Sequence, residues 1–162
     1  MVKYRRLNKE ELEELKDDFI KFLAAQSISA DDWESWKTNK IEKVDDLIDL
    51  FSDIVMEKIL NNIDFLEMLA PNEIKIFSMD IKRARMVGVR MNSNEIDLRK
   101  SEDINSFFSD IQKGMNHNPE VFHIEKEYTK PKADEVYFLI ENGATVTNEM
   151  LYNSIDALIK RR

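Results

Sequence analysis

The feature that most constrains this chain is the stretch from Ile41 to Leu69, where apolar side chains recur every three or four residues. The repeating positions are Ile41, Val44, Ile48, Phe51, Val55, Ile59, Ile63 and Leu66. Because this spacing follows the helical repeat of about 3.6 residues, it predicts one continuous helix that ends before Pro71. Neighbouring apolar residues widen the stripe beyond half of the circumference, so we expect this helix to pack against two neighbours at once.

The opposite side of this predicted helix is acidic. Carboxylates recur there at steps of four residues, at Asp45, Asp49, Asp53 and Glu57. Like charges at this spacing repel one another, and a solvated face explains them best, with a metal or a basic partner as the alternative. Leu50, Leu60 and Met68 interrupt the polar side. Singly exposed apolar residues are ordinary on a protein surface, and the alternative is that these three form the edge of a partner surface. The hypothesis that the chain forms a homodimer rests on this alternative.

Composition restricts the class of protein to which the chain belongs. Its 162 residues suit one domain, and 43% hydrophobic with 35% charged residues exclude wholesale disorder. No apolar run approaches the length of about twenty residues that a membrane helix needs, and none follows residues 1–6 as in a secretory signal. Cysteine is absent, which excludes disulfides and thiolate sites. We therefore expect a cytoplasmic protein without membrane contact, and the net charge of −8 disfavours nucleic acid as a partner.

Helical and alternating patterns occupy the rest of the chain. Helices are predicted over residues 8–25, 29–36, 101–115 and 147–159. Asn8 and Glu11 have the spacing of a capping box at the start of the first helix. Strands are predicted over residues 74–78, 83–91, 96–98, 120–128 and 135–140. The first two should form a hairpin that turns near Asp80.

These elements predict a single α+β domain over residues 1–162. An N-terminal helical layer, residues 1–70, contains the long central helix. We expect this layer to pack on a small, mostly antiparallel sheet, which residues 72–162 form together with two further helices.

A basic hairpin is the most distinctive predicted surface, with cations at Lys82, Arg83, Arg85 and Arg90. On a strand, Arg83 and Arg85 point to one face, whereas Arg90 points to the other unless Gly88 introduces a bulge. RNA binding through residues 82–90 is therefore an alternative rather than the main hypothesis, because single-strand binding also needs stacking aromatics and only Phe77 is near. We favour pairing of these cations with acidic helices of this protein or of a partner protein.

Trp33 and Trp36 are the other candidate partner-binding residues. They share one helix face at a spacing of three. A lid over the helical layer is the favoured interpretation, and an aromatic cage for a cationic ligand is the alternative.

Catalytic patterns in the sequence are short. Carboxylates precede lysines by two residues in Asp80-Ile81-Lys82 and Glu73-Ile74-Lys75. Such pairs can hold Mg²⁺, so a metal-dependent hydrolase is a second alternative. His123, Glu125 and Glu127 alternate along a strand and could ligate a metal, although a solvent-facing strand explains them equally well. Because no nucleophile has a matched base and no glycine-rich phosphate loop is present, we predict no catalytic residue, no cofactor and no bound metal.

Four segments carry a resemblance to a known family. They are Lys3-Tyr4-Arg5-Arg6-Leu7, Ala30-Asp31-Asp32-Trp33-Glu34, Leu50-Phe51-Ser52-Asp53-Ile54-Val55 and Ala133-Asp134-Glu135-Val136-Tyr137-Phe138-Leu139-Ile140-Glu141-Asn142-Gly143. Together they resemble a family of short acidic cytoplasmic proteins of unknown function from Bacteroidota. The resemblance implies a cytoplasmic single-domain protein and no particular site. The sequence thus favours a non-catalytic protein–protein interaction or regulatory module, whose partner is another protein or a second copy of the chain.

Overall fold

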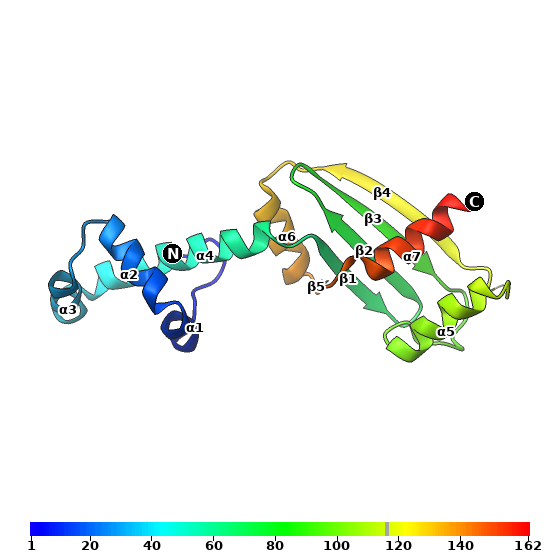
Figure 1. Ribbon diagram of the computed structural model, residues 1–162, viewed down its shortest axis with the longest axis horizontal. Coiled ribbons are helices and arrows are strands. Elements are labelled where there is room, and N and C mark those ends of the chain that lie inside the picture. The colour runs from blue at the N-terminus through cyan, green and yellow to red at the C-terminus, as the bar shows by residue number, and fades with distance from the viewer. Residues whose placement is uncertain (116) are drawn as a thin grey trace. The chain divides into compact units, whose positions relative to one another are not determined.

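The computed structural model describes residues 1–115 and 117–162 (Figure 1). The chain divides into two compact units, Met1–Ile59 and Leu60–Arg162, which we call the helical unit and the sheet unit. The described residues form seven helices and one five-stranded antiparallel sheet, which confirms the predicted α+β class. Packing of the helical layer on the sheet, within a single domain, stays a prediction.

Four helices begin in the helical unit. They are α1 (Lys9–Glu14), α2 (Lys16–Ala25), α3 (Ala30–Asn39) and α4 (Ile41–Asn61). The single helix predicted over residues 8–25 is interrupted at Leu15, whose φ of −97° and ψ of 17° separate α1 from α2. The predicted capping box is confirmed, because Asn8 Oδ1 accepts from the Glu11 N–H at 2.8 Å and Glu11 Oε2 accepts from the Asn8 N–H at 2.9 Å.

The helical unit has an aromatic core. Phe19 packs against Phe51 with ring centroids 5.0 Å apart, and Phe22 lies 5.4 Å from the same ring. Ser52 is fully buried beside Phe51 in α4. Its hydroxyl donates to the Ile48 carbonyl at 2.7 Å and accepts from the Leu7 N–H at 3.1 Å, so it joins the N-terminal segment to α4.

The acidic face of α4 also binds the N-terminal segment. Asp53 accepts from the backbone N–H groups of Lys3 and Tyr4 at 2.8–3.1 Å. Arg6 pairs with Asp49 at 2.5 Å and with Asp45 at 3.1 Å. The chain's own backbone and cations therefore relieve the like-charge repulsion that the sequence predicts along this row.

The prediction of one helix from Ile41 to Leu69 is wrong, because α4 ends at Asn61 and β1 covers Phe65–Ala70. An apolar run this short fits a buried strand as well as a helix. Residues 65–70 form a strand because they pair with β2 on one side and with β5 on the other, and Leu66 is fully buried between them. Leu60 is also buried, and Met68 lies in β1. The proposed homodimer edge on one helix face is therefore not formed.

The sheet unit contains all five strands. The other four are β2 (Glu73–Met79), β3 (Arg83–Arg90), β4 (Glu120–Glu127) and β5 (Thr145–Val146), and the spatial order is β4-β3-β2-β1-β5. The predicted hairpin is confirmed as β2–β3, with the Asp80 N–H bonded to the Arg83 carbonyl at 2.9 Å. Gly88 pairs regularly on both sides, so the ladder has no bulge at that position.

Three helices, rather than the predicted two, accompany the sheet. They are α5 (Ser101–Gln112), α6 (Lys132–Glu141) and α7 (Glu149–Lys160). The strand predicted over residues 135–140 is part of α6, because Ala133 and Val136 are buried at helical spacing and acidic residues suit the first turn. Residues 96–98 form no strand either. The buried Leu98 instead donates its N–H to the Pro71 carbonyl at 2.8 Å.

One face of the sheet builds the core of this unit. Side chains from β2 and β3 pack with residues of α5 and α7, the main members being Ile74, Ile76, Val87, Val89, Phe107 and Ile155. All six are at most 1% exposed. These residues follow the strand period of two and the helical period of three to four, which is why both element types place them in one layer.

Candidate functional site

The basic hairpin does not present its cations together. Arg83 and Arg85 share one face and Arg90 lies on the other, as their parity predicts. Arg85 Nη1 donates to Asp156 at 2.5 Å and to the Tyr152 hydroxyl at 2.9 Å. The ammonium of Lys160 and the Arg85 guanidinium together lower the pKa of Asp156. Arg85 thus clamps α7 to the sheet.

Arg90 is also bound within the sheet unit. It pairs with Glu73 at 2.6 Å and with Glu120 at 3.2 Å, and the adjacent Lys75 and Arg90 lower the pKa of Glu73. Lys82 and Arg83 are exposed at the end of the hairpin. Only these two hairpin cations face solvent without an ion pair to another described residue.

The two tryptophans of α3 have separate environments and form no shared cage. Trp33 packs edge to face on Phe19, with ring centroids 5.2 Å apart. The ring of Trp36 lies under the ammonium groups of Lys40 and Lys43, at 5.4 and 5.2 Å from the centroid. Two of the chain's own cations therefore already occupy the ring that a cationic ligand would need.

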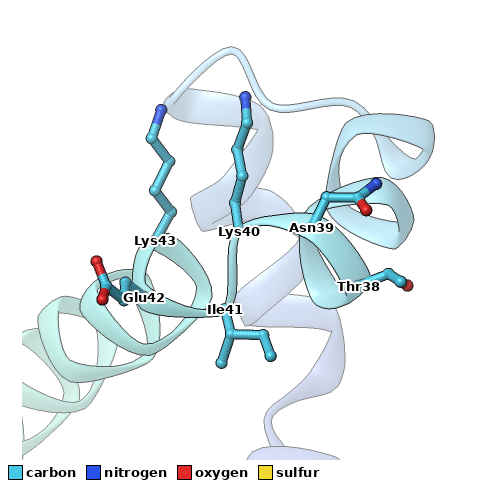
Figure 2. A pocket seen from close by; sticks show the side chains of 6 residues that line it. All are labelled: Thr38, Asn39, Lys40, Ile41, Glu42 and Lys43. Atoms are coloured by element: carbon cyan, nitrogen blue, oxygen red, sulfur yellow. The ribbon is translucent and has the colours of Figure 1, made fainter.

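A cavity of about 500 Å³ lies at the junction of α3 and α4, lined by residues 38–43. Figure 2 shows Lys40 and Lys43 extending in one direction and Ile41 in the opposite direction, with Glu42 pointing away from Asn39. These consecutive side chains diverge, and a binding site requires polar groups that converge. We assign no site to this cavity.

Carboxylates in the sheet unit do not gather into a metal site. No group of three or more potential ligands is close enough together within residues 1–115 and 117–162. Asp80 accepts from the Ile81 N–H in the β2–β3 turn at 2.7 Å. On β4, His123 and Glu127 are exposed, while Glu125 lies 3.6 Å from Arg85.

An apolar groove in the helical unit is lined by side chains from several helices. It lies along α1, α2 and α3, and its volume is about 700 Å³. Its apolar lining comprises Leu12, Phe19, Ile20, Leu23, Ile28 and Trp33. We call it the α2–α3 groove. Ile20 is 54% exposed within it, although the same chain buries Leu23 one turn away.

Charged residues surround this groove, at Lys9, Lys16, Lys37, Glu13 and Glu34. Lys37 and Glu34 pair with each other at 2.6 Å. Lys9 and Lys16 make no ion pair with any other residue that the structure describes. Glu13, on the same rim, likewise has no ion pair to a described residue, so the unpaired rim groups carry a net positive charge beside an apolar floor.

In the helix predicted over residues 8–25, the helical repeat places Leu12, Phe19 and Leu23 on one apolar stripe and leaves Ile20 outside it. An apolar residue beside a complete stripe is the only signal in the sequence that the surface continues past the core. The partner in the groove, Trp33, comes from another helix. Which helix α3 would face does not follow from its own pattern.

Comparison with known proteins adds a family. None of the described helices is long and apolar enough to cross a bilayer. No curated protein and no solved structure matches the chain significantly. A family model, described as a family of unknown function (DUF6495), matches residues 1–160. The predicted membership in a family of unknown function is confirmed, and the chain belongs to DUF6495.

Proposed function

We propose that this protein is a non-catalytic interaction module and that the α2–α3 groove binds an acidic, amphipathic helical segment of a partner protein. The observation that carries the proposal is the coincidence of an apolar floor with unpaired lysines on its rim. Helix-in-groove recognition uses these two elements, since apolar side chains enter the groove and flanking charges set the orientation.

The size of the groove suits a segment of this kind. Pockets that enclose a whole small molecule span roughly 300–1,000 Å³, so a groove of about 700 Å³ has room for several apolar side chains of a helical segment. Phe19 and Trp33 pack edge to face, with ring centroids 5.2 Å apart, and together supply one rigid aromatic surface of the groove. Aromatic side chains in such surfaces often dominate binding energy, because they bury large areas and lose little rotamer freedom.

The charge of the rim selects the partner. Lys9 and Lys16 attract carboxylates, and no described acidic side chain pairs with them. A partner segment with Glu or Asp beside its apolar face would provide that pairing, and a basic segment would be repelled. The net charge of −8 on the whole chain makes this cationic rim a local exception.

We further propose that the protein acts in the cytoplasm, which the absence of cysteine supports. Acidity and an origin in Bacteroidota as properties of the whole family belong to the same proposal. RNA binding and metal-dependent hydrolysis gain no supporting geometry from the residues described.

The test uses fluorescence of Trp33, which lines the groove. Trp36→Phe removes the other tryptophan, and a designed Leu- and Glu-rich amphipathic helical peptide is titrated into this variant at low salt. We expect a blue shift that saturates and that weakens as salt rises, because ion pairing contributes to binding. A peptide with the same apolar face and Lys in place of Glu should bind at least about tenfold more weakly.

Matched variants separate the groove from the rest of the surface. Ile20→Asp should abolish the shift, whereas Ile54→Asp, which changes a similarly exposed isoleucine of α4, should leave it unchanged. Lys16→Glu should weaken binding, and Lys21→Glu, which lies outside the groove, should not. Equal binding of the acidic and basic peptides, or equal loss in both isoleucine variants, would refute the proposal.

A further inference from the structure

The outer edge of the sheet is long and unpaired on the side of β4. Only β3 pairs with β4 among the described strands, and β4 forms the end of the sheet in Figure 1. The opposite edge is the two-residue β5. Residues 123–127 of β4 are all exposed, and Lys126 also forms an ion pair with Glu135 of α6 at 3.4 Å.

The free hydrogen-bonding groups of β4 can be identified. Tyr128, just after β4, donates its N–H to the Lys82 carbonyl on the β3 side at 2.9 Å. Successive residues of a strand direct their backbone groups to alternate sides. The N–H and C=O groups of Val121, His123 and Glu125 therefore point away from the sheet and lack strand partners.

We propose that two copies of this chain associate through these edges, antiparallel, across a two-fold axis at His123. In this register the outward-pointing groups of the two strands meet and extend the sheet from one copy into the other. The proposal is independent of the α2–α3 groove, because it uses only the sheet unit.

Side-chain complementarity selects this register. Glu120 of each copy faces Lys126 of the other, which gives two opposite-charge pairs by symmetry. These pairs add to the contacts that each residue makes within its own chain, Glu120 with Arg90 and Lys126 with Glu135. Phe122 of each copy faces Ile124 of the other on the same face. A shift by two residues in either direction removes all of these pairs, for example by placing Lys126 against Phe122.

The pairs of Phe122 with Ile124 would cover an apolar surface that is exposed to solvent in the single chain. Ile124 is 59% exposed, and the Phe122 ring beside it lies over Gly88, where it fills the space of a missing side chain. Both pairs occupy the non-hydrogen-bonded positions, where side chains of antiparallel strands approach most closely. Two Phe122 and two Ile124 side chains would thus form one apolar cluster across the axis.

The charges on β4 determine which strand can pair with it in this arrangement. Charged residues on an edge strand usually prevent pairing. Here Lys126 opposes a carboxylate of the second copy, so the same charge that disfavours other strands favours this one. Pro119 precedes β4 and lacks an N–H, so it ends the ladder at that side.

Sedimentation velocity of the full chain tests the proposal, over about 10 µM to 1 mM because one strand pair buries less than a standard interface of about 1,600 Å². Wild type should pass from monomer to dimer within this range. Glu120→Lys and Lys126→Glu should each weaken self-association about tenfold or more, because each creates two like-charge pairs. Melting curves by circular dichroism show whether the variants remain folded.

Charge exchange gives the decisive comparison. A mixture of the two single variants should form a heterodimer, and the double variant E120K/K126E should recover the homodimer, since both restore opposite charges. Amide exchange should also slow with concentration at residues 121, 123 and 125. A monomer at all concentrations, or a dimer that the charge variants leave unchanged, would overturn the proposal.

Discussion

Replacing Ser52 by alanine should destabilise the helical unit, although serine to alanine usually favours a helix. Ser52 is fully buried, and its hydroxyl is the acceptor for the Leu7 N–H at 3.1 Å. Leu7 is itself only 4% exposed, so water does not readily replace the lost acceptor. Ser52→Ala therefore leaves a buried N–H without a partner.

The magnitude follows from two opposing contributions. An unsatisfied buried N–H costs about 1–3 kcal/mol, while the better helix propensity of alanine returns about 0.5 kcal/mol. The net loss should be about 1–2 kcal/mol. Units of this size rarely exceed about 3–5 kcal/mol of stability, so roughly a fifth to two thirds of the free energy of unfolding would be lost.

Urea denaturation followed by tryptophan fluorescence measures this change directly, because both tryptophans belong to α3 of the helical unit. With an m-value of about 1 kcal/mol/M, the midpoint should fall by about 1–2 M. Amide exchange at Leu7 should accelerate in the same variant.

Ser35→Ala provides the control. Ser35 is exposed on α3, so its replacement should change stability by no more than about 0.5 kcal/mol. If Ser52→Ala shifted the midpoint no more than Ser35→Ala does, the hydroxyl bridge would not be the link between the N-terminal segment and α4.

Three further predictions concern other groups. The Arg5 guanidinium and the Asn8 backbone hold the pKa of Glu11 at about 2, below its ordinary 4.5. Ionised Glu11 therefore stabilises the fold above pH 4.5, and this stabilisation is lost as pH falls towards 2. Glu11→Gln should flatten the acid unfolding curve in that window, as followed by tryptophan fluorescence. Gly88→Ala should reduce the free energy of unfolding by about 1–3 kcal/mol and the melting temperature by several degrees, because a Cβ there would overlap the Phe122 ring. An unchanged melting temperature would show that the ring moves freely. Burial, with nearby carboxylates, raises the pKa of Tyr128 to about 12, and its hydroxyl has no hydrogen-bond partner among the described residues. Because a buried hydroxyl without a partner is destabilising, Tyr128→Phe should keep or raise the melting temperature. A decrease would show that the hydroxyl has a hydrogen-bond partner.

Local sequence signals predicted the elements that they fully determine. Asn8 and Glu11 form their capping box because both partners lie within one turn. The β2–β3 hairpin follows from alternating residues around Asp80. The predictions for two apolar runs are wrong: residues 65–70 form a strand instead of a helix, and residues 135–140 form a helix instead of a strand. A run this short fits both periodicities, so its tertiary neighbours determine which element forms.

The candidate site was harder to predict than the fold. Trp33 was identified as a candidate, and its role in a groove depends on Phe19 and Ile20 of another helix. Parity predicts the faces on which the hairpin cations lie, but the ion pairs of Arg85 with Asp156 and of Arg90 with Glu73 depend on contacts between elements. Spacing predicts which residues share a face, whereas contacts between faces require the tertiary structure.

The unequal lengths of the two terminal strands limit how far the sheet can grow. β4 offers eight residues to an incoming strand, and β5 offers only two. Polymerisation into a fibril needs two sheet edges on every subunit that can each pair with another strand, and here only the β4 edge is long enough. Once two β4 strands have met, no comparable edge remains, so assembly by this route stops at a closed pair.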